Sequence, residues 1–201
     1  MNRRSLITGT ALVAAVSGCL DVLEGDGDLE DETDGDGDAN RDGDGDDPSF
    51  EITTVDGPGS DAGTATVPAD GQIQLVNFSR ITCPTSRDML SRVGEARRRL
   101  AESTTVGPDG TVHVLTVVDG SSGADPTPSE LADWWAEQDG DWTVGIDEDG
   151  ALFDHHDVSV TPTTVAIDPA GTVHWRDEDA TTASNLVSGV ERALEDADGV
   201  R

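Results

Sequence analysis

The residue best suited to chemistry in this sequence is a cysteine, Cys83, which lies where a predicted strand gives way to a predicted helix. Pro84 suits the first position of a helix, because a residue there needs no N–H donor, and this makes Cys83 the N-cap. The unpaired N–H groups and the dipole at a helix N-terminus favour negative charge, so this thiol should ionise readily, and the thiolate is its reactive form. Ser86, three residues further on, can donate its hydroxyl to the sulfur, and Arg80 and Arg87 add positive potential. An inert, partly buried cysteine is the alternative.

A proline also stands in an unusual place, at Pro162 in the segment VTPTTV, which leads into a predicted core strand. A proline cannot donate a hydrogen bond to a neighbouring strand, so it is rarely found just before a central one. A cis bond between Thr161 and Pro162, in a tight turn, would accommodate it. The backbone edge beside such a turn could pair with an extended segment of a substrate.

The elements that must position these residues follow from the spacing of apolar side chains. A near-continuous apolar run at residues 111–118 is typical of a parallel strand that is buried on both faces. Apolar residues recur at helical spacing after Pro84 and again near the C-terminus. The predicted strands are residues 72–78, 111–118, 142–146, 163–167 and 172–176. The predicted helices are residues 84–101, residues 129–138 with Ser129 as N-cap, and a last helix that carries Leu186, Val187, Val190 and Leu194.

The order of these elements predicts an α/β fold with a mixed central β-sheet flanked by helices, in a single domain. The turn sequence DPAG at residues 168–171 joins the last two strands, so they are predicted to form an antiparallel hairpin. Residues 50–55 are expected to add an edge strand, and the PGSDAG sequence at residues 58–63 is expected to be a loop.

Three segments of this domain resemble the thioredoxin-like superfamily, in particular its membrane-tethered TlpA/ResA-type (redoxin) branch. LVNFSRITCPTS (residues 75–86) is similar to that branch's strand, Trp-Cys-x-x-Cys motif and helix. VTPTTVAIDPAGTVHWR (residues 160–176) is similar to its cis-proline, strand and hairpin, and DGALFDHHDVSVTPTT (residues 149–164) to the short helix before that proline. The resemblance covers about residues 64–196 and implies thiol–disulfide exchange. It also implies that Cys83 is the thiol, Pro162 the cis-proline and Thr161 its backbone partner.

Three departures from the family motif limit what the resemblance implies. Thr82 replaces the tryptophan before the first cysteine, and Ser86 replaces the second cysteine. Asn77 stands where thioredoxins have a buried acid, and it cannot take up a proton. A dithiol cycle is therefore not expected.

We expect a single reactive cysteine whose mixed disulfide is resolved by an outside thiol. The expected catalytic residues are Cys83, Ser86, Thr161 and Pro162, with no cofactor and no metal, and the expected partners are protein thiols or disulfides or a low-molecular-weight thiol. The alternative function is a catalytically decayed binding module, in which the groove near Pro162 still holds peptides or partner proteins.

Two neighbouring families fit less well. Peroxiredoxins have a threonine three residues before their cysteine, where this chain has Arg80. Copper chaperones of the Sco type use Cys-x-x-x-Cys with a distant histidine, and Arg87 occupies the place of the second cysteine. His155 and His156 could supply nitrogen ligands for copper, but adjacent side chains point apart, and one thiol with one imidazole makes a poor site. His113 and His174 are expected to be packing or surface residues.

The N-terminus has the features of an export signal sequence. Arg3 and Arg4 precede an apolar stretch at residues 6–16, which resembles a twin-arginine signal, and VSGC at residues 16–19 resembles a lipobox. Residues 1–18 are therefore expected to be a lipoprotein signal peptide and Cys19 the site of lipid attachment; the alternative is a plain secretory signal in which Cys19 is incidental. Residues 19–47, rich in Asp and Gly, are expected to be a disordered tether to the folded domain, residues 48–201. Calcium binding by this stretch is disfavoured, because Ala39 stands where an EF-hand loop needs glycine. The protein is expected at the extracytoplasmic face of the membrane, as a monomer.

The composition excludes several classes of protein. The 201 residues include 42 Asp and Glu against 12 Lys and Arg, a formal net charge of −30, so binding to a nucleic-acid backbone is not expected. All the basic residues are arginine, and the acidity resembles that of proteins from halophilic archaea, in which molar salt shortens the Debye length to about 3 Å. No apolar run reaches the roughly 18–20 residues that a membrane-spanning helix needs.

Overall fold

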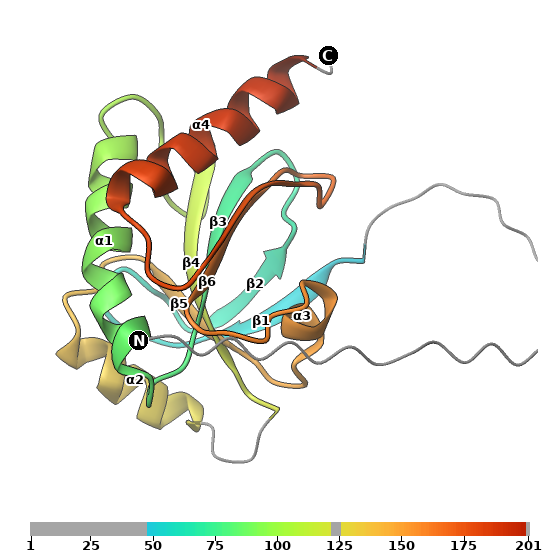
Figure 1. The fold of residues 1–201 in the computed structure, drawn as a ribbon. Helices are drawn as coiled ribbons and strands as arrows, with labels where there is room; N and C mark the ends of the chain where they lie inside the picture. Colours follow the sequence, from blue (N-terminus) through green and yellow to red (C-terminus); the bar gives the residue numbers. More distant parts are fainter. Residues whose placement is uncertain (1–47, 122–125, 200–201) are drawn as a thin grey trace, which may run out of the picture. The chain divides into compact units, whose positions relative to one another are not determined.

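The computed structural model describes residues 48–121 and 126–199, and they form one seven-stranded sheet with helices on both faces (Figure 1). The strand order is β2-β1-β5-β4-β3-β6-β7. The strands are β1 (Phe50–Thr54), β2 (Gly63–Val67), β3 (Ile73–Ser79), β4 (Val112–Asp119), β5 (Thr143–Asp147), β6 (Thr163–Ile167) and β7 (Val173–Glu178). The helices are α1 (Pro84–Leu100), α2 (Pro128–Glu137), α3 (Ala151–His155) and α4 (Ala183–Gly199).

The centre of the sheet is the parallel pair β3 and β4, which α1 connects. Their register runs from Ile73 opposite Val112 to Ser79 opposite Val118, and every residue of both strands is buried. β5 continues the parallel part beside β4, whereas β6 pairs with β3 and β1 pairs with β5 in the antiparallel sense. The predicted mixed α/β sheet with an antiparallel β6–β7 hairpin is therefore confirmed.

Each face of the sheet has its own apolar core. On one face, α1, α2 and α4 pack on the strands with Met89, Val93, Trp135, Leu186 and Val190 among their buried side chains. On the other face, the short helix α3 packs its residues Leu152 and Phe153 on β3, β4 and β6. Figure 1 shows α1 and α4 next to each other on the first face, with α3 beside β1. Helices of opposite faces thus enclose the sheet, as its doubly buried strands require.

Three details differ from the sequence-based predictions. β1 is not an edge strand, because β2, which was not predicted, pairs with its outer side over five residues. The sequence GTATV of β2 has little apolar character, so its position depends on pairing with β1 rather than on a pattern of its own. The N-cap of α2 is Thr127 and not Ser129, since Thr127 forms a reciprocal capping box with Glu130 and Pro128 is the first helical residue.

The three parallel strands each extend one residue beyond their predicted ends. They finish at Ser79, Asp119 and Asp147, and the last two are register partners on β4 and β5. Carboxyl ends of parallel strands meet at one edge of a sheet, so polar residues from three strands converge at the edge where α1 begins. This edge contains the candidate site.

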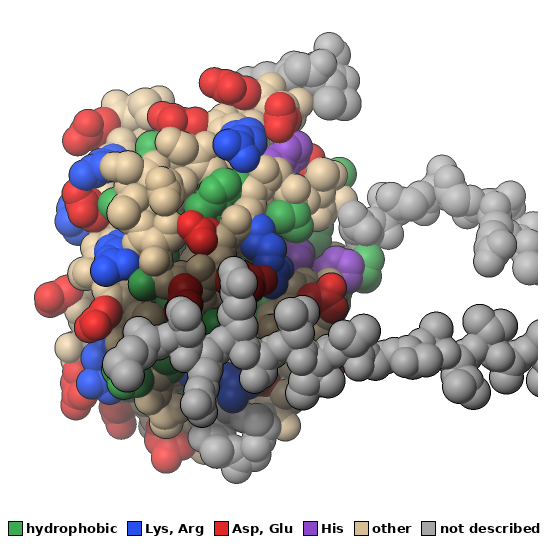
Figure 2. Space-filling model, in the orientation of Figure 1, with side chains coloured by type: hydrophobic (Ala, Val, Ile, Leu, Met, Phe, Trp, Pro, Cys, Tyr) green, Lys and Arg blue, Asp and Glu red, His purple; other side chains and the backbone are tan. Residues whose placement is uncertain are grey.

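Acidic side chains spread over the face of the domain shown in Figure 2 instead of gathering in one patch, with arginines between them. Such a distribution is what a solvating surface requires.

None of the helices within the described ranges is long and apolar enough to cross a membrane. The expected signal peptide (residues 1–18), the lipid attachment at Cys19 and the tether (residues 19–47) lie outside the described residues.

Candidate active site

Cys83 is the N-cap of α1, with extended backbone dihedrals (φ −89°, ψ 116°) and Pro84 as the first helical residue. The chain leaves β3 at Ser79 and turns so that the N–H of Cys83 donates to the carbonyl of Arg80 at 3.0 Å. The carbonyl of Cys83 then accepts the N–H of Arg87 at 3.1 Å. The thiol is therefore fixed to the rim of the sheet by the backbone on both of its sides, and it is half-buried.

A second loop comes to the same place from far along the chain. The Thr161–Pro162 peptide bond is cis, as expected, and the Sγ of Cys83 donates to the carbonyl oxygen of Thr161 at 3.4 Å. Thr163 closes this turn, because its hydroxyl donates to the carbonyl of Val160 at 2.7 Å and its backbone begins β6. The antiparallel pairing of β6 with β3 thus carries the turn against the thiol.

Hydrogen bonds around the sulfur favour its ionised form. Partial burial raises the pKa of Cys83, but the side chain and backbone N–H of Ser86, the backbone N–H of Thr85 and the side chain of Thr161 outweigh it, and the pKa lies below its ordinary value. A thiol S–H donates to the Thr161 carbonyl, whereas a thiolate must draw on the N–H and O–H donors instead. The surroundings of Cys83 therefore suit a thiolate.

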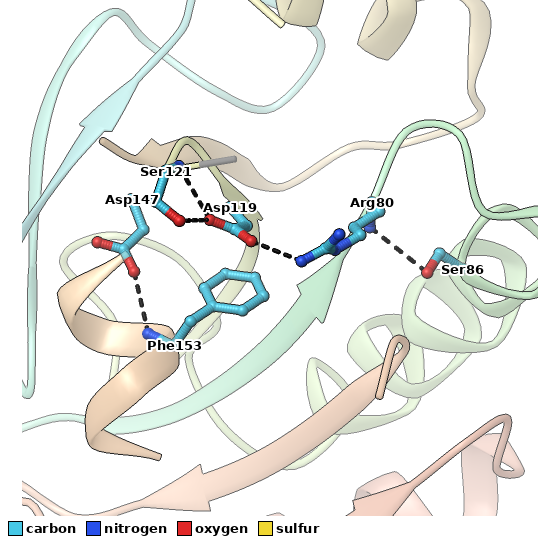
Figure 3. A network of polar contacts seen from close by, with 6 residues as sticks. All are labelled: Arg80, Ser86, Asp119, Ser121, Asp147 and Phe153. Carbon is cyan, nitrogen blue, oxygen red and sulfur yellow. Dashed lines mark hydrogen bonds and ion pairs between the residues drawn. The ribbon is translucent and has the colours of Figure 1, made fainter. Parts of the chain in front are cut away.

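Ser86 is fully buried, and its hydroxyl lies between the sulfur and the preceding loop. The N–H of Arg80 approaches the Oγ of Ser86 at 3.5 Å, as Figure 3 shows. Since that oxygen accepts from Arg80, the hydroxyl proton is left for the sulfur of Cys83. Cys83, Ser86, Thr161 and Pro162 are thus brought together, and their roles as catalytic residues remain predictions.

Asn77, which stands where the family resemblance places a buried acid, has a neutral set of partners. Asn77 is fully buried, its Oδ1 accepts from the Thr164 hydroxyl at 3.2 Å, and its Nδ2 donates to the Thr116 hydroxyl at 3.4 Å. Thr116 in turn accepts from the indole N–H of Trp142 at 2.9 Å. These partners hold Asn77 in a closed network of neutral groups, which offers no acceptor for a proton from the thiol.

A charged network beside the thiol was not predicted. Arg80 contacts the carboxylate of Asp119 with an Nη2–Oδ2 distance of 2.7 Å, and Asp119 also accepts from Ser121 (Figure 3). The nearby Asp147 accepts the N–H of Phe153 at 3.0 Å. The sequence carries only a weak signal for this network, because Asp119 and Asp147 look like the polar ends of two buried strands.

The histidines do not join the thiol in a metal site. His155 packs against the ring of Phe50 and His156 against that of Phe78, at centroid distances of 5.0 Å and 5.6 Å. The two imidazole rings also lie 4.9 Å apart in a T-shaped arrangement, so the expectation that these adjacent side chains point apart is wrong. Burial lowers the pKa of His113 to about 4, and its ring is hydrogen-bonded to Thr143. Among the described residues, no group of three or more His, Cys, Asp or Glu side chains is arranged to hold a metal ion.

The fold is shared with several solved structures. StoA from Bacillus subtilis is 16% identical, covers 70% of this chain and 95% of its own, and superposes with a TM-score of 0.57. The pneumococcal exposed lipoprotein thioredoxin Etrx1 from Streptococcus pneumoniae is 18% identical, with 72% and 98% covered and a TM-score of 0.58. A secreted disulfide oxidoreductase of Mycobacterium tuberculosis is 14% identical, with 71% and 94% covered and a TM-score of 0.53.

Comparison of the sequence itself with protein-family models and with curated proteins yields no match. The three-dimensional likeness, at identities of 14–18%, concerns the arrangement of strands and helices. The shared arrangement comprises the mixed central sheet and the helices that pack on it. The described part of this chain therefore has the thioredoxin-like fold.

Proposed function

We propose that this chain is an exported, lipid-anchored, monomeric thiol–disulfide exchange protein that works through the single thiol of Cys83. The observation that supports this most is the position of the Cys83 sulfur, at the start of α1 and 3.4 Å from the Thr161 carbonyl. The hydrogen bonds that lower the pKa of Cys83 increase the share of reactive thiolate at neutral pH.

The first step is attack of the Cys83 thiolate on one sulfur of a partner disulfide. A new S–S bond forms to Cys83, the partner's S–S bond breaks, and its other sulfur leaves as a thiolate that takes a proton from solvent. The backbone at Thr161 lies beside the sulfur and can pair with an extended segment of the partner. The donors of Ser86 and Thr85 stabilise Cys83 again when it is the leaving thiolate.

The second step needs a thiol from outside the chain. Ser86 occupies the position three residues after Cys83, and a hydroxyl cannot displace the mixed disulfide. Asn77 cannot accept a proton either, so the incoming thiol must arrive as a thiolate or lose its proton to solvent. Its attack on the partner's sulfur returns Cys83 as a thiolate and leaves the partner in a new disulfide.

The test uses the full chain with Cys19→Ser, so that Cys83 is the only thiol, and measures alkylation by iodoacetamide against pH in molar salt. The rate should follow a single ionisation whose pKa lies below the value of about 8.5 for a free cysteine. A Cys83→Ser control should not react. Slow alkylation with a pKa of 8.5 or higher would overturn the proposal.

The anchored location is tested separately, since it rests on the N-terminal sequence. Expression in a lipoprotein-processing host should place the parent chain in the detergent phase of a Triton X-114 partition. The Cys19→Ser variant should move to the aqueous phase, and equal partition of the two would contradict the anchor.

The binding-module alternative predicts a different outcome in a capture experiment. If Cys83→Ala retains the same partner proteins as the parent under oxidising conditions, the Thr161–Pro162 turn binds partners without thiol chemistry. Loss of capture in this variant, with recovery of mixed disulfides from the parent, supports the exchange reaction.

A further inference from the structure

Arg80 is held in one place by a carboxylate that is itself fixed. Its Nη2 lies 2.7 Å from the Oδ2 of Asp119, a residue that is 5% exposed at the end of β4. The Oδ1 of Asp119 accepts from the backbone N–H of Ser121 at 2.9 Å and from its hydroxyl at 2.6 Å. Both oxygens of Asp119 are therefore occupied, and a guanidinium that turned away would leave the buried Oδ2 without its charged partner.

This guanidinium still has donors to offer. A guanidinium carries five N–H donors in a planar fork, which matches a second carboxylate well. Within the described residues, the side chain of Arg80 bonds only through Nη2, and it is 47% exposed. The remaining N–H groups have no partner among the described residues, so they can bind a dissolved group while Nη2 stays on Asp119.

The cation lies on the same rim as the thiol. The carbonyl of Arg80 accepts the N–H of Cys83 at 3.0 Å, so the two residues close one turn between β3 and α1. β4 flanks β3 on one side and β6 flanks it on the other. The guanidinium of Arg80 is therefore on the β4 side of the site, where Figure 3 shows it against Asp119. The Thr161–Pro162 turn directly precedes β6 and is on the other side.

The net charge of the chain affects how it can recognise an anionic partner. A net charge of −30 repels anionic partners at low salt, and at molar salt long-range attraction is screened within about 3 Å. Recognition of an anion then depends on direct, geometrically matched contact, which a pre-positioned guanidinium provides.

We propose that Arg80 is a specificity residue that binds a carboxylate carried close to the sulfur of the thiol or disulfide exchanged at Cys83. This inference rests on the proposed exchange function and names its substrate class, a thiol compound with a nearby carboxylate. Asp119 and Ser121 are positioning residues, because they act by holding Arg80. The exchange itself is unchanged: Cys83 gains a bond to one sulfur, the S–S bond breaks, and the other half leaves as a thiolate.

The test compares disulfide probes of different charge, using the Cys19→Ser chain in molar salt at one pH. Second-order rate constants are measured with anionic dithiobis(nitrobenzoate), neutral dithiodipyridine and cationic cystamine. Arg80→Met should slow the anionic probe on the order of tenfold, as loss of a charge-assisted contact implies, and leave the other two within about twofold.

Two further variants keep the result interpretable. Arg80→Met with Asp119→Asn removes both charges of the pair, so the net charge is unchanged and no carboxylate is left unpaired; it should show the same selective loss. Arg87→Met removes an equal charge from an exposed residue in the first turn of α1 and should affect the anionic probe less than about twofold at molar salt.

The outcomes separate this inference from the function on which it rests. If Cys83 fails to react even with dithiodipyridine, the exchange function is wrong. If all probes react but Arg80→Met slows them equally, or Arg87→Met slows the anionic probe as much, the carboxylate contact is overturned.

The source of the carboxylate is tested by two matched pairs of substrates. The small-molecule pair is the disulfide of mercaptopropionic acid against that of mercaptoethanol. The peptide pair carries Asp or Asn next to a disulfide-bonded cysteine. A preference for the carboxylate member that disappears with Arg80→Met supports the proposal and identifies the source, whereas no preference in either pair overturns it.

Discussion

The sulfur of Cys83 lies 3.4 Å from the carbonyl oxygen of Thr161, although 78 positions separate the two residues in the sequence. The contact follows from the position of β6, which pairs with β3 and begins directly after the cis-proline turn. The protonated thiol therefore has an acceptor for its S–H, and the donors of Ser86 and Thr85 stabilise the thiolate. Both protonation states are accommodated at one place, as reversible exchange requires.

Removing the Ser86 hydroxyl should raise the pKa of Cys83. Ser86→Ala deletes the first of the hydrogen bonds that counteract the burial of the thiol, while the backbone donors of residues 85 and 86 remain. We expect alkylation at neutral pH to slow several-fold and the pH profile to move to higher pH. The measurement is the thiolate absorbance or iodoacetamide rate against pH in the Cys19→Ser chain.

Ser91→Ala is the matched control for that variant. Ser91 is an exposed serine of the same helix, whose hydroxyl donates to the carbonyl of Asp88 instead of the thiol. The pH profile of Cys83 alkylation in Ser91→Ala should coincide with that of the parent. If both serine variants shift the profile equally, Ser86 does not act on the sulfur directly.

A second cysteine at position 86 should allow the chain to resolve its own mixed disulfide without an external thiol. Ser86 is buried one helical turn from Cys83, and its side chain is near enough to lower the pKa of the thiol. In Ser86→Cys the new thiol can attack the mixed disulfide, form an internal disulfide with Cys83 and release the reduced partner. Rapid quenching and mass spectrometry should find this internal disulfide without added thiol, and an accumulating mixed disulfide would contradict the geometry.

The sequence predicted the parts of the site that have local signals. Pro84 and Pro162 each mark a turn into a regular element, so the thiol and the opposing turn could be located without a structure. The core strands were recognisable because apolar runs such as residues 111–118 are buried on both faces.

The parts that escaped prediction depend on pairing between distant segments. β2 has no pattern of its own, because it is an edge strand whose place is set by its register with β1. Arg80 and Asp119 look like ordinary charged residues 39 positions apart, and only the parallel register that places Ser79 opposite Val118 brings them together. Contacts set by register cannot be derived from the composition of either segment.

His174 should stabilise the domain over a defined pH range. Its two ring nitrogens lie 2.8 Å from Asp168 in the β6–β7 turn and 2.9 Å from Asp196 on α4. Burial lowers the pKa of His174, but the hydrogen bonds and charges of both aspartates outweigh it and raise the pKa above 6.5. For Asp168, burial is outweighed by its bonds from His174 and the turn backbone, so its pKa falls below 3.8.

The signs of these shifts define the range. The contribution of His174 is complete below pH 6.5 and is lost as pH rises through its higher folded pKa. That of Asp168 is complete above pH 3.8 and is lost as pH falls through its lower folded pKa. His174→Gln should therefore reduce the free energy of unfolding by about 1 kcal/mol near pH 5 and by less at pH 9.

Denaturant unfolding across this pH range measures the effect, with His155→Gln as the control. His155 is exposed on α3, and Phe50 is its ring neighbour on β1. A loss in His174→Gln that is constant with pH would show that the imidazole contributes by packing and not by its charge.

The ionised carboxylate of Asp147 should destabilise the folded domain at neutral pH, whereas His174 and Asp168 stabilise it. Burial raises the pKa of Asp147, and repulsion from Asp149 and Asp119 adds to it, while the N–H groups of Phe153 and Leu152 offset this only in part. A carboxyl whose pKa is raised by folding stabilises the folded state when protonated. That contribution is complete below pH 3.8 and is lost as pH rises through the folded pKa.

Asp147→Asn should accordingly be more stable than the parent at pH 7, by up to about 1 kcal/mol, because it removes a like charge opposite Asp119. The amide oxygen can still accept the N–H of Phe153, so the start of α3 keeps its partner. The gain should shrink as the pH falls and Asp147 in the parent takes up its proton. Asp149→Asn, an exposed neighbour, removes the same charge without relieving a buried group and should gain less. An Asp147→Asn variant that is less stable at pH 7, with a deficit that persists in acid, would mean that the carboxylate holds α3 in a way an amide cannot.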